Sequence, residues 1–255
     1  PALVARVRSA DLLLVVGSRL GEASSQGYAL LSPGGPALVH VHPDRRETGR
    51  VFAAALAIEA APAAFARAAR TLDVGDATRW RDWTAAARAD YVSDSAPPPG
   101  TALLDIGAVM AELQQVLPAD AIVTVDAGNF SGWPQRFLRH GGRRRLLGAA
   151  NGAMGYGVPA AVAAKLRFPE RLVIGCAGDG GFGMTGQELA TAVQCRAAPI
   201  ILAFDNGIYG TIRMHQERRY PERTLGTTLG RADLAAVARG WGAHGESIER
   251  TEDFA

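Results

Sequence analysis

The chain has 255 residues, 48% of them hydrophobic and 20% charged, which is enough for one or two globular domains with substantial cores. Its net charge of +2 is too small to indicate a nucleic-acid partner, and no apolar run is long enough to span a membrane or act as a signal peptide. We therefore expect a soluble, cytoplasmic protein that binds neither nucleic acid nor membrane.

The first hundred residues show the pattern of an α/β domain followed by helices. Within residues 1–60 we expect a helix, a strand over 12–16 and a second strand over 37–41. Residues 61–100 are rich in alanine and predict helix as far as the sequence SAPPPG at 95–100. The three prolines of this sequence favour an extended spacer, so a domain boundary is expected there.

Strands and helices alternate after residue 101, which indicates an α/β protein with a parallel sheet. The expected elements are helices over 105–117, 158–166 and 233–241, strands over 121–125, 172–177 and 199–204, and one helix between the last two strands. The three arginines at 143–145 are interpreted as a solvated loop ahead of a strand or turn at Leu146.

The two cysteines, Cys176 and Cys195, both lie within apolar elements. Buried free thiols are therefore expected rather than a disulfide. Redox chemistry at these residues is not expected.

The strands at 172–177 and 199–204 flank a helix with a recognisable start. Thr185 and Glu188 form a T-x-x-E capping box, and apolar residues then recur at helical spacing. The unit is β-α-β, and a right-handed crossover of this kind makes its two strands parallel.

Polar ligands follow both strands of this unit. Asp179 and Asn206 are expected at one edge of the sheet, where open α/β sheets bind ligands. The chain turns at Gly207 and can aim the carbonyl of Ile208 at the same point; a carboxylate, an amide oxygen and a carbonyl are magnesium-type ligands. Glycines allow close approach of a phosphate at Gly178, Gly180, Gly181 and Gly183, and the helix beginning near Thr185 offers unpaired N–H groups. The sequence predicts a metal–diphosphate site.

Two other interpretations fit the glycine-rich segment. It is explained by a tight turn alone, or by a dinucleotide site, since Gly178, Gly180 and Gly183 match G-x-G-x-x-G after a strand. Asp205 then lies where a ribose-binding acid is usual, so an NAD-binding Rossmann oxidoreductase is an alternative. Asp179 argues against it, because its carboxylate would repel a bare pyrophosphate unless a cation lay between them.

Several segments resemble the thiamin-diphosphate-dependent enzymes. GDG, followed after 25 residues by Asn206, is similar to the cofactor signature of that family. NGAMGYGVP at 151–159 and DAGNFSGW at 126–133 resemble segments of its acetohydroxyacid (acetolactate) synthase and pyruvate-oxidase-like branch. DLLLVVGSRLGE at 11–22 and LVHVHPD at 38–44 resemble the second half of that branch's central domain. The motifs follow the family's order over nearly the whole chain.

The resemblance implies an α/β fold with three-layer, doubly wound parallel sheets, the thiamin-diphosphate-binding fold, in two partial domains. Residues 1–60 would be the C-terminal part of the central domain, 61–100 a helical segment with a proline-rich linker, and 101–255 the diphosphate- and magnesium-binding domain. A pyrimidine-binding domain before Pro1 would be missing, as would a last strand and helix after Ala255. That domain carries the catalytic glutamate in the family, so no residue here is assigned a catalytic role, and the chain alone is expected to be inactive.

The resemblance also implies cofactor contacts. Asp179, Asn206 and the carbonyl of Ile208 would hold Mg²⁺. The diphosphate would lie against the backbone of Gly178, Gly180, Gly181, Tyr209, Gly210 and Thr211, with one further contact to Asn129. Met154 would support the bent cofactor, and the carbonyl of Gly152 would accept a hydrogen bond from its 4′-amino group. Without the resemblance, Met154 would be assigned to the core.

These implications point to an enzyme that cleaves or forms a carbon–carbon bond next to the carbonyl of a 2-oxo acid, similar to acetolactate synthase. Another thiamin-diphosphate decarboxylase, carboligase or lyase is an alternative, as is a non-catalytic cofactor-binding or interaction subunit. A homodimer or homotetramer is implied, and nothing in the sequence supports FAD as an additional cofactor. His215 stands where true synthases often have tryptophan; it would face substrate, act as an acid or base, or lie on the surface of a mobile, arginine-rich segment at 208–228.

Overall fold

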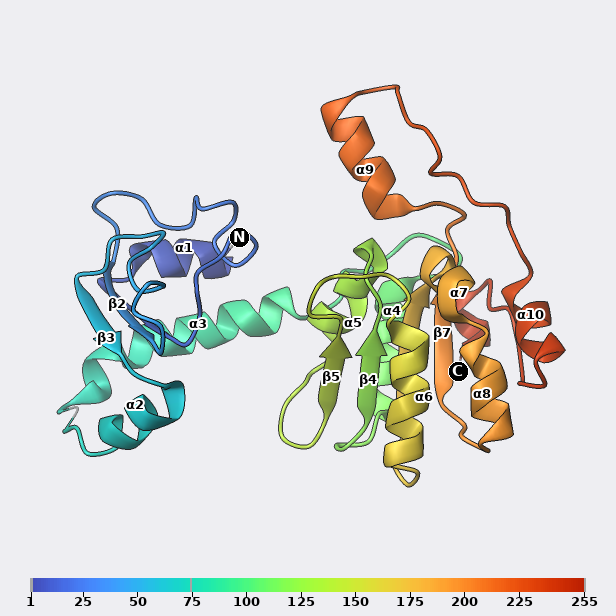
Figure 1. The fold of residues 1–255 in the computed structure, drawn as a ribbon, viewed down its shortest axis with the longest axis horizontal. Coiled ribbons are helices and arrows are strands. Elements are labelled where there is room, and N and C mark those ends of the chain that lie inside the picture. The colour runs from blue at the N-terminus through green and yellow to red at the C-terminus, as the bar shows by residue number, and fades with distance from the viewer. Residues whose placement is uncertain (1, 74, 255) are drawn as a thin grey trace. The chain divides into compact units, whose positions relative to one another are not determined.

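The structure is a computed structural model that describes residues 2–73 and 75–254 (Figure 1). It divides into two compact units, residues 1–94 and 95–255, and each is considered by itself. Expectations about what precedes Pro1 or follows Ala255 lie outside the described residues. Within the described ranges, no helix combines the length and the apolar character that crossing a bilayer requires.

The first unit contains a three-stranded parallel sheet in the order β1-β2-β3. Its elements are α1 (Ala2–Ser9), β1 (Leu12–Val16), β2 (Ala37–His42), β3 (Leu56–Glu59), α2 (Pro62–Ala69), η1 (Ala77–Trp80) and α3 (Arg81–Asp94). β1 has the predicted bounds, and β2 is one residue longer than predicted. β3 was not predicted, because its four residues continue an alanine-rich apolar stretch that shows no strand-like alternation.

The second unit is built on a four-stranded parallel sheet in the order β5-β4-β6-β7. Its elements are α4 (Ile106–Val116), β4 (Ile122–Val125), η2 (Asn129–Ser131), α5 (Gly132–Phe137), β5 (Arg145–Gly148), α6 (Gly157–Arg167), β6 (Val173–Gly178), α7 (Asp179–Thr185), α8 (Glu188–Gln194), β7 (Ile200–Phe204), α9 (Gly210–Arg219), α10 (Leu234–Gly240) and η3 (Thr251–Asp253). The predicted α/β class with parallel sheets is confirmed.

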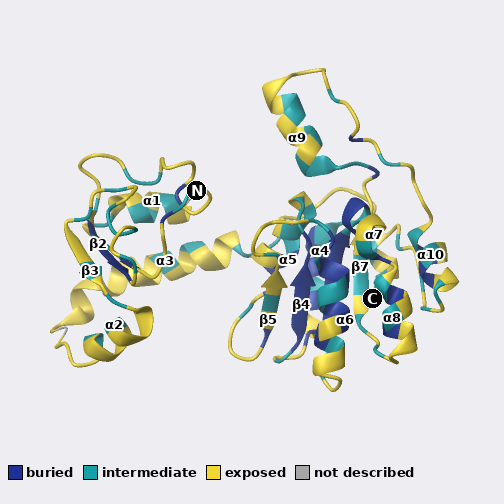
Figure 2. Cartoon of the chain, in the orientation of Figure 1, coloured by how far each residue is buried: buried dark blue, intermediate teal, exposed yellow. Residues whose placement is uncertain are grey.

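Helices cover both faces of this sheet, because alternate residues of its central strands point to opposite sides. Val123, Val125, Ile174 and Cys176 form a core with residues of α4 and α5. Ile122, Val173 and Ala177 pack on the other face against α6, α7 and α8. Figure 1 shows α6 and α8 in front of the sheet and α4 behind it, and Figure 2 shows the buried central strands between them. The second unit therefore has three layers.

The connection between β6 and β7 differs from the prediction. It contains two short helices, α7 and α8, instead of one capped helix. Thr185 ends α7, and its hydroxyl lies 3.5 Å from the carbonyl of Gly181; Gln187 precedes α8 without a side-chain cap. The predicted capping box is wrong because helix starts directly after β6, at Asp179, and is already ending at Thr185. The first helical turn after β6 therefore begins at Asp179, not near Thr185.

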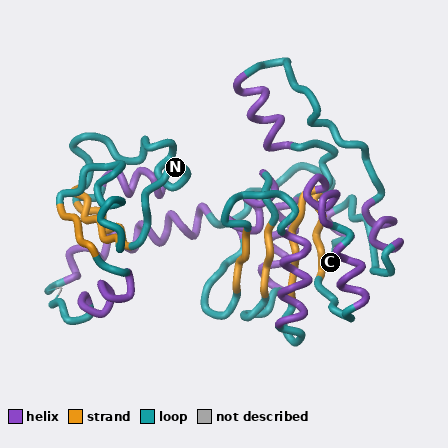
Figure 3. Tube along the Cα trace, in the orientation of Figure 1, coloured by secondary structure: helices purple, strands orange, loops and turns teal. Residues whose placement is uncertain are grey.

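Residues 210–219, expected to lie in a mobile segment, form helix α9 (Figure 3). None of its residues is buried, and His215 is exposed on it. Its sequence contains Arg, Met, Gln and Glu, which favour helix even without an apolar face. The prediction missed α9 because it relied on hydrophobic periodicity.

Both cysteines are free, but only Cys176 is buried. Cys195 is exposed because it follows the last turn of α8 as its C-cap, so the prediction of burial is wrong for this residue. Burial raises the pKa of the Cys176 thiol to about 12, which leaves almost no thiolate at neutral pH.

We expect one thiol per chain, Cys195, to react with a chromogenic disulfide reagent at pH 8, and the second only after denaturation. The native Cys195→Ser variant should show no fast reaction. Rapid reaction of both thiols in the native wild type would contradict the burial of Cys176.

Candidate functional site

The order of the strands defines where a ligand would bind. The chain leaves β4 towards β5 on one side and leaves β6 towards β7 on the other. Open α/β sheets bind ligands at such a switch point, outside the carboxyl ends of the two strands. Asp126 follows β4 and Asp179 follows β6, so both carboxyl groups lie at this point.

A cavity of about 1820 Å³ opens at this edge and continues along β7. It brings together eleven of the twelve residues predicted to contact a cofactor: Asn129, Met154, Gly178, Asp179, Gly180, Gly181, Asn206, Ile208, Tyr209, Gly210 and Thr211. Gly152 is not among the lining residues; it is exposed and lies two positions before Met154, with φ of +69°. Residues of α8, β7 and α10, together with Leu104, Ile106, Val109 and residues 244–249, line much of the rest of the cavity.

The Asp179 carboxylate is fixed by two backbone hydrogen bonds. Oδ1 accepts from the N–H of Gly180 at 2.8 Å, and Oδ2 accepts from the N–H of Gly207 at 2.7 Å. Each oxygen keeps a further acceptor position, because a carboxylate has about four in total. Asp179 can therefore ligate a metal ion without losing these bonds.

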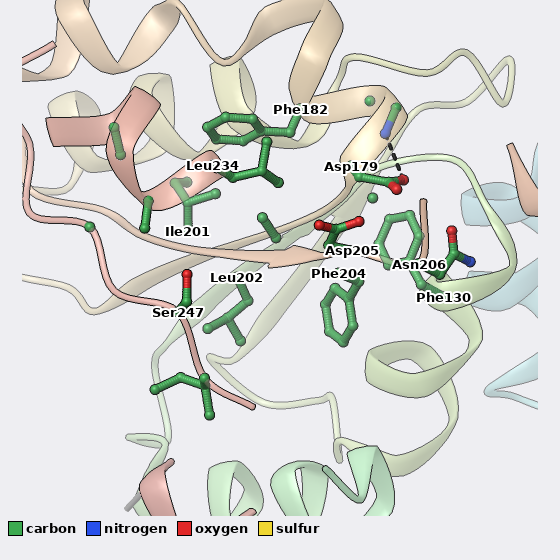
Figure 4. Close-up of a pocket in the computed structure, with 18 of the residues that line it drawn as sticks. Phe130, Asp179, Phe182, Ile201, Leu202, Phe204, Asp205, Asn206, Leu234 and Ser247 are labelled. Atoms are coloured by element: carbon green, nitrogen blue, oxygen red, sulfur yellow. Dashed lines mark hydrogen bonds between the residues drawn. The ribbon is translucent and has the colours of Figure 1, made fainter. Parts of the chain in front are cut away.

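Asp205 lies beside Asp179, and Figure 4 shows the two carboxyl groups close together. The N–H of Gly207 donates to both, at 3.0 Å to Oδ1 of Asp205. Burial raises the pKa of the Asp179 carboxyl, the backbone N–H groups lower it, and the Asp205 carboxylate raises it further. A divalent cation would offset this repulsion. The sequence alone indicates Asp205 only as a ribose-binding acid of a dinucleotide site.

The other two predicted metal ligands follow β7. The side chain of Asn206 is exposed, and its Oδ1 accepts from the N–H of Ile208 at 3.0 Å. The carbonyl of Ile208 accepts from the N–H of Gly210 at 2.9 Å. Each oxygen has a second lone pair available. One carboxylate, one amide and one carbonyl fit Mg²⁺, which also keeps water ligands. Residues 2–73 and 75–254 contain no cluster of three or more His, Cys, Asp or Glu suited to a metal.

Neighbouring side chains leave little room for a β-carbon at two of the glycines near Asp179. A β-carbon at Gly180 would overlap the ring of Tyr209 and lie 3.2 Å from Cε of Met154. A β-carbon at Gly178 would lie 3.1 Å from the ring of Phe130. Gly180 thus leaves room for the side chains of Met154 and Tyr209 next to the start of α7.

Asn129 connects the site to α9. Its Oδ1 accepts from the hydroxyl of Thr211 at 2.9 Å, and its Nδ2 lies 3.9 Å from the sulfur of Met214. The neighbouring Phe130 stacks on Phe204, with ring centroids 5.2 Å apart. No sequence pattern predicts these contacts, because they join residues far apart in the chain.

A metal-ligand set at the switch point of a doubly wound parallel sheet is typical of α/β proteins that bind a phosphorylated ligand through a cation. Comparison with known families then identifies the particular kind. Residues 126–255 match the family "Thiamine pyrophosphate enzyme, C-terminal TPP binding domain", and the chain belongs to this family. The resemblance noted in the sequence is thereby confirmed.

Curated relatives extend the similarity to the first unit. The chain is 29% identical over 249 residues to the acetolactate synthase isozyme 2 large subunit of Escherichia coli, covering 96% of this chain and 44% of that protein. It is 26% identical over 280 residues to a sulfoacetaldehyde acetyltransferase of Alcaligenes xylosoxydans, covering 97% and 46%. A pyruvate oxidase of Lactiplantibacillus plantarum is 35% identical over 133 residues, covering 52% and 22%. The chain thus spans less than half the length of these relatives.

Proposed function

We propose that this protein is a magnesium- and thiamin-diphosphate-dependent enzyme, similar to acetolactate synthase, that cleaves or forms a carbon–carbon bond next to the carbonyl of a 2-oxo acid. The observation that supports this most directly is that one cavity is lined by Asp179, Asn206 and Ile208 together with Met154. Membership of the family supports the cofactor, and the similarity to acetolactate synthase supports the reaction.

In this proposal the chain holds the cofactor at two ends. Asp179, Asn206 and the carbonyl of Ile208 would hold Mg²⁺, and the metal would offset the charge of the diphosphate. The backbone of Gly180 and Gly181 and of residues 209–211 would surround the diphosphate. Met154 would support the rings, and the carbonyl of Gly152 would accept a hydrogen bond from the 4′-amino group. When bound, thiamin diphosphate would supply the carbon nucleophile. The protein would orient the cofactor and provide its electrostatic environment.

The proposal includes an assembly of at least two chains, a homodimer or homotetramer, and a small 2-oxo acid as substrate. The names of the relatives include a synthase, an acetyltransferase and an oxidase. Another thiamin-diphosphate reaction is therefore the second candidate, because the same cofactor site would serve each of them.

Calorimetry on the intact protein tests the cofactor. We expect thiamin diphosphate to bind in the presence of Mg²⁺, to lose most of its affinity when the metal is chelated, and NAD not to bind. Tight binding of NAD, without a magnesium-dependent signal for thiamin diphosphate, would refute the proposal. Turnover of pyruvate and of larger 2-oxo acids then separates a synthase from the other reactions.

A further inference from the structure

Asp126 is a buried carboxylate that the proposed cofactor contacts do not include. Its residue is 2% exposed, at the carboxyl end of β4. Oδ1 accepts from the N–H groups of Ala127 at 2.8 Å and Tyr156 at 3.2 Å, and Oδ2 accepts from the N–H of Gly155 at 2.9 Å. Two of the three donors belong to the loop between β5 and α6. The carboxylate therefore joins that loop to the end of β4.

The same carboxylate lies against the first turn of α7. A β-carbon at Gly181 would overlap Oδ2 of Asp126, and a β-carbon at Gly157 would lie 3.1 Å from the Cβ of Asp126. Both glycines therefore allow backbone to approach this side chain. Asp126 is enclosed by β4, by the loop that contains Gly152 and Met154, and by α7.

We propose that Asp126 is a positioning residue that fixes the distance between the two ends of the cofactor site. Its bonds to Gly155 and Tyr156 hold the loop between β5 and α6, which contains Met154, against Gly181 in α7. In the proposed function this loop would lie against the cofactor rings, and Gly181 would lie against the diphosphate. Hydrogen bonds to an ionised acceptor are stronger than neutral ones, and three of them share this carboxylate. The consequence for cofactor binding rests on the proposed function, whereas the effect on the loop does not.

Asp126→Asn tests this role, because an amide cannot accept hydrogen bonds at both of its ends. Thiamin diphosphate occupies both ends of the site, whereas inorganic pyrophosphate occupies only the diphosphate end. With Mg²⁺ present, we expect the variant to raise the Kd for thiamin diphosphate by about tenfold and to leave the Kd for pyrophosphate nearly unchanged. Equal weakening of both ligands would indicate a general structural role and overturn the proposal.

Asp105→Asn is the matched control. The Asp105 carboxylate also accepts three backbone N–H bonds, from Gly100, Gly107 and Ala108, and it caps α4. Its loss should reduce stability without changing the ratio of the two Kd values. If Asp126→Asn does not fold, Asp126→Glu replaces it. This variant keeps the charge but extends the side chain towards Gly181. We again expect a higher Kd for thiamin diphosphate and a nearly unchanged Kd for pyrophosphate.

Hydrogen exchange in the metal-free protein gives a test that needs no cofactor. The amides of Gly155 and Tyr156 should exchange faster in Asp126→Asn and at the wild-type rate in Asp105→Asn. Unchanged exchange at both amides in Asp126→Asn would overturn the proposal. If exchange responds as expected but the wild type does not bind thiamin diphosphate, the proposed function fails while the role of Asp126 in holding the loop is supported.

Discussion

Asp179→Ala is expected to remove magnesium-dependent binding of thiamin diphosphate. Asp179 is the only carboxylate in the proposed ligand set, so its loss takes away the charge that attracts Mg²⁺ and, through the metal, the diphosphate. The expected rise in Kd is at least about hundredfold, equivalent to about 2.8 kcal/mol. The measurement is the increase in Tm produced by saturating Mg²⁺ and thiamin diphosphate, together with calorimetric Kd values.

The metal-free variant should remain folded. The raised pKa of Asp179, caused by burial and by Asp205, means that its charge is disfavoured in the folded metal-free protein, so removing it relieves repulsion. Asp120→Ala is a suitable control, because Asp120 precedes the amino end of β4, whereas the candidate site lies at the carboxyl ends of the strands. A mutant Tm that still rises by the wild-type amount with cofactor and metal would show that Asp179 does not hold the metal.

The parts of the fold that could be predicted depend on local signals. The strand at Leu12–Val16 is an apolar run between turn residues, and β4 and β6 are apolar because helices bury both of their faces. Asp105 and Asp233 were placed at the starts of helices, and their carboxylates do accept hydrogen bonds from the first turns of α4 and α10. The position of Asp179 and Asn206 at one edge follows from parallel strands alone.

The remaining features depend on tertiary contacts. The three bonds of Asp126 join it to residues up to 30 positions away, and no spacing rule places Tyr156 near it. Asn129 lines the cavity with the other predicted diphosphate residues, and its amide also contacts Thr211 and Met214 in α9, which no spacing rule predicts. The T-x-x-E pattern at Thr185 wrongly predicted the start of a helix there. A capping signal acts only where a helix begins, and Thr185 is the last residue of α7, which begins at Asp179.

Arg144 is the clearest departure from the sequence interpretation. It was assigned to a solvated run of arginines, yet it is only 9% exposed. Its guanidinium donates to the carbonyls of Leu117, Pro118 and Arg139 and to Oε1 of Gln114. These groups lie at the carboxyl end of α4 and in the segment before β5. One buried guanidinium therefore joins the α4–β4 connection to the segment that leads into β5. A cation is also favourable next to the carbonyls that end a helix.

We expect Arg144→Met to destabilise the second unit by about 3 kcal/mol, because methionine fills part of the space but leaves several carbonyls without a donor. Arg143→Met is the matched control: the Arg143 side chain is 83% exposed and lies 3.8 Å from Asp120, so its loss should cost less than about 0.5 kcal/mol. The free energy of unfolding is measured from hydrogen exchange of the β4 amides, which reports on this unit separately from the other. Equal stabilities of the two variants would mean that the bonds of Arg144 contribute no more than an ordinary surface contact, and the segment before β5 would then be held by its backbone alone.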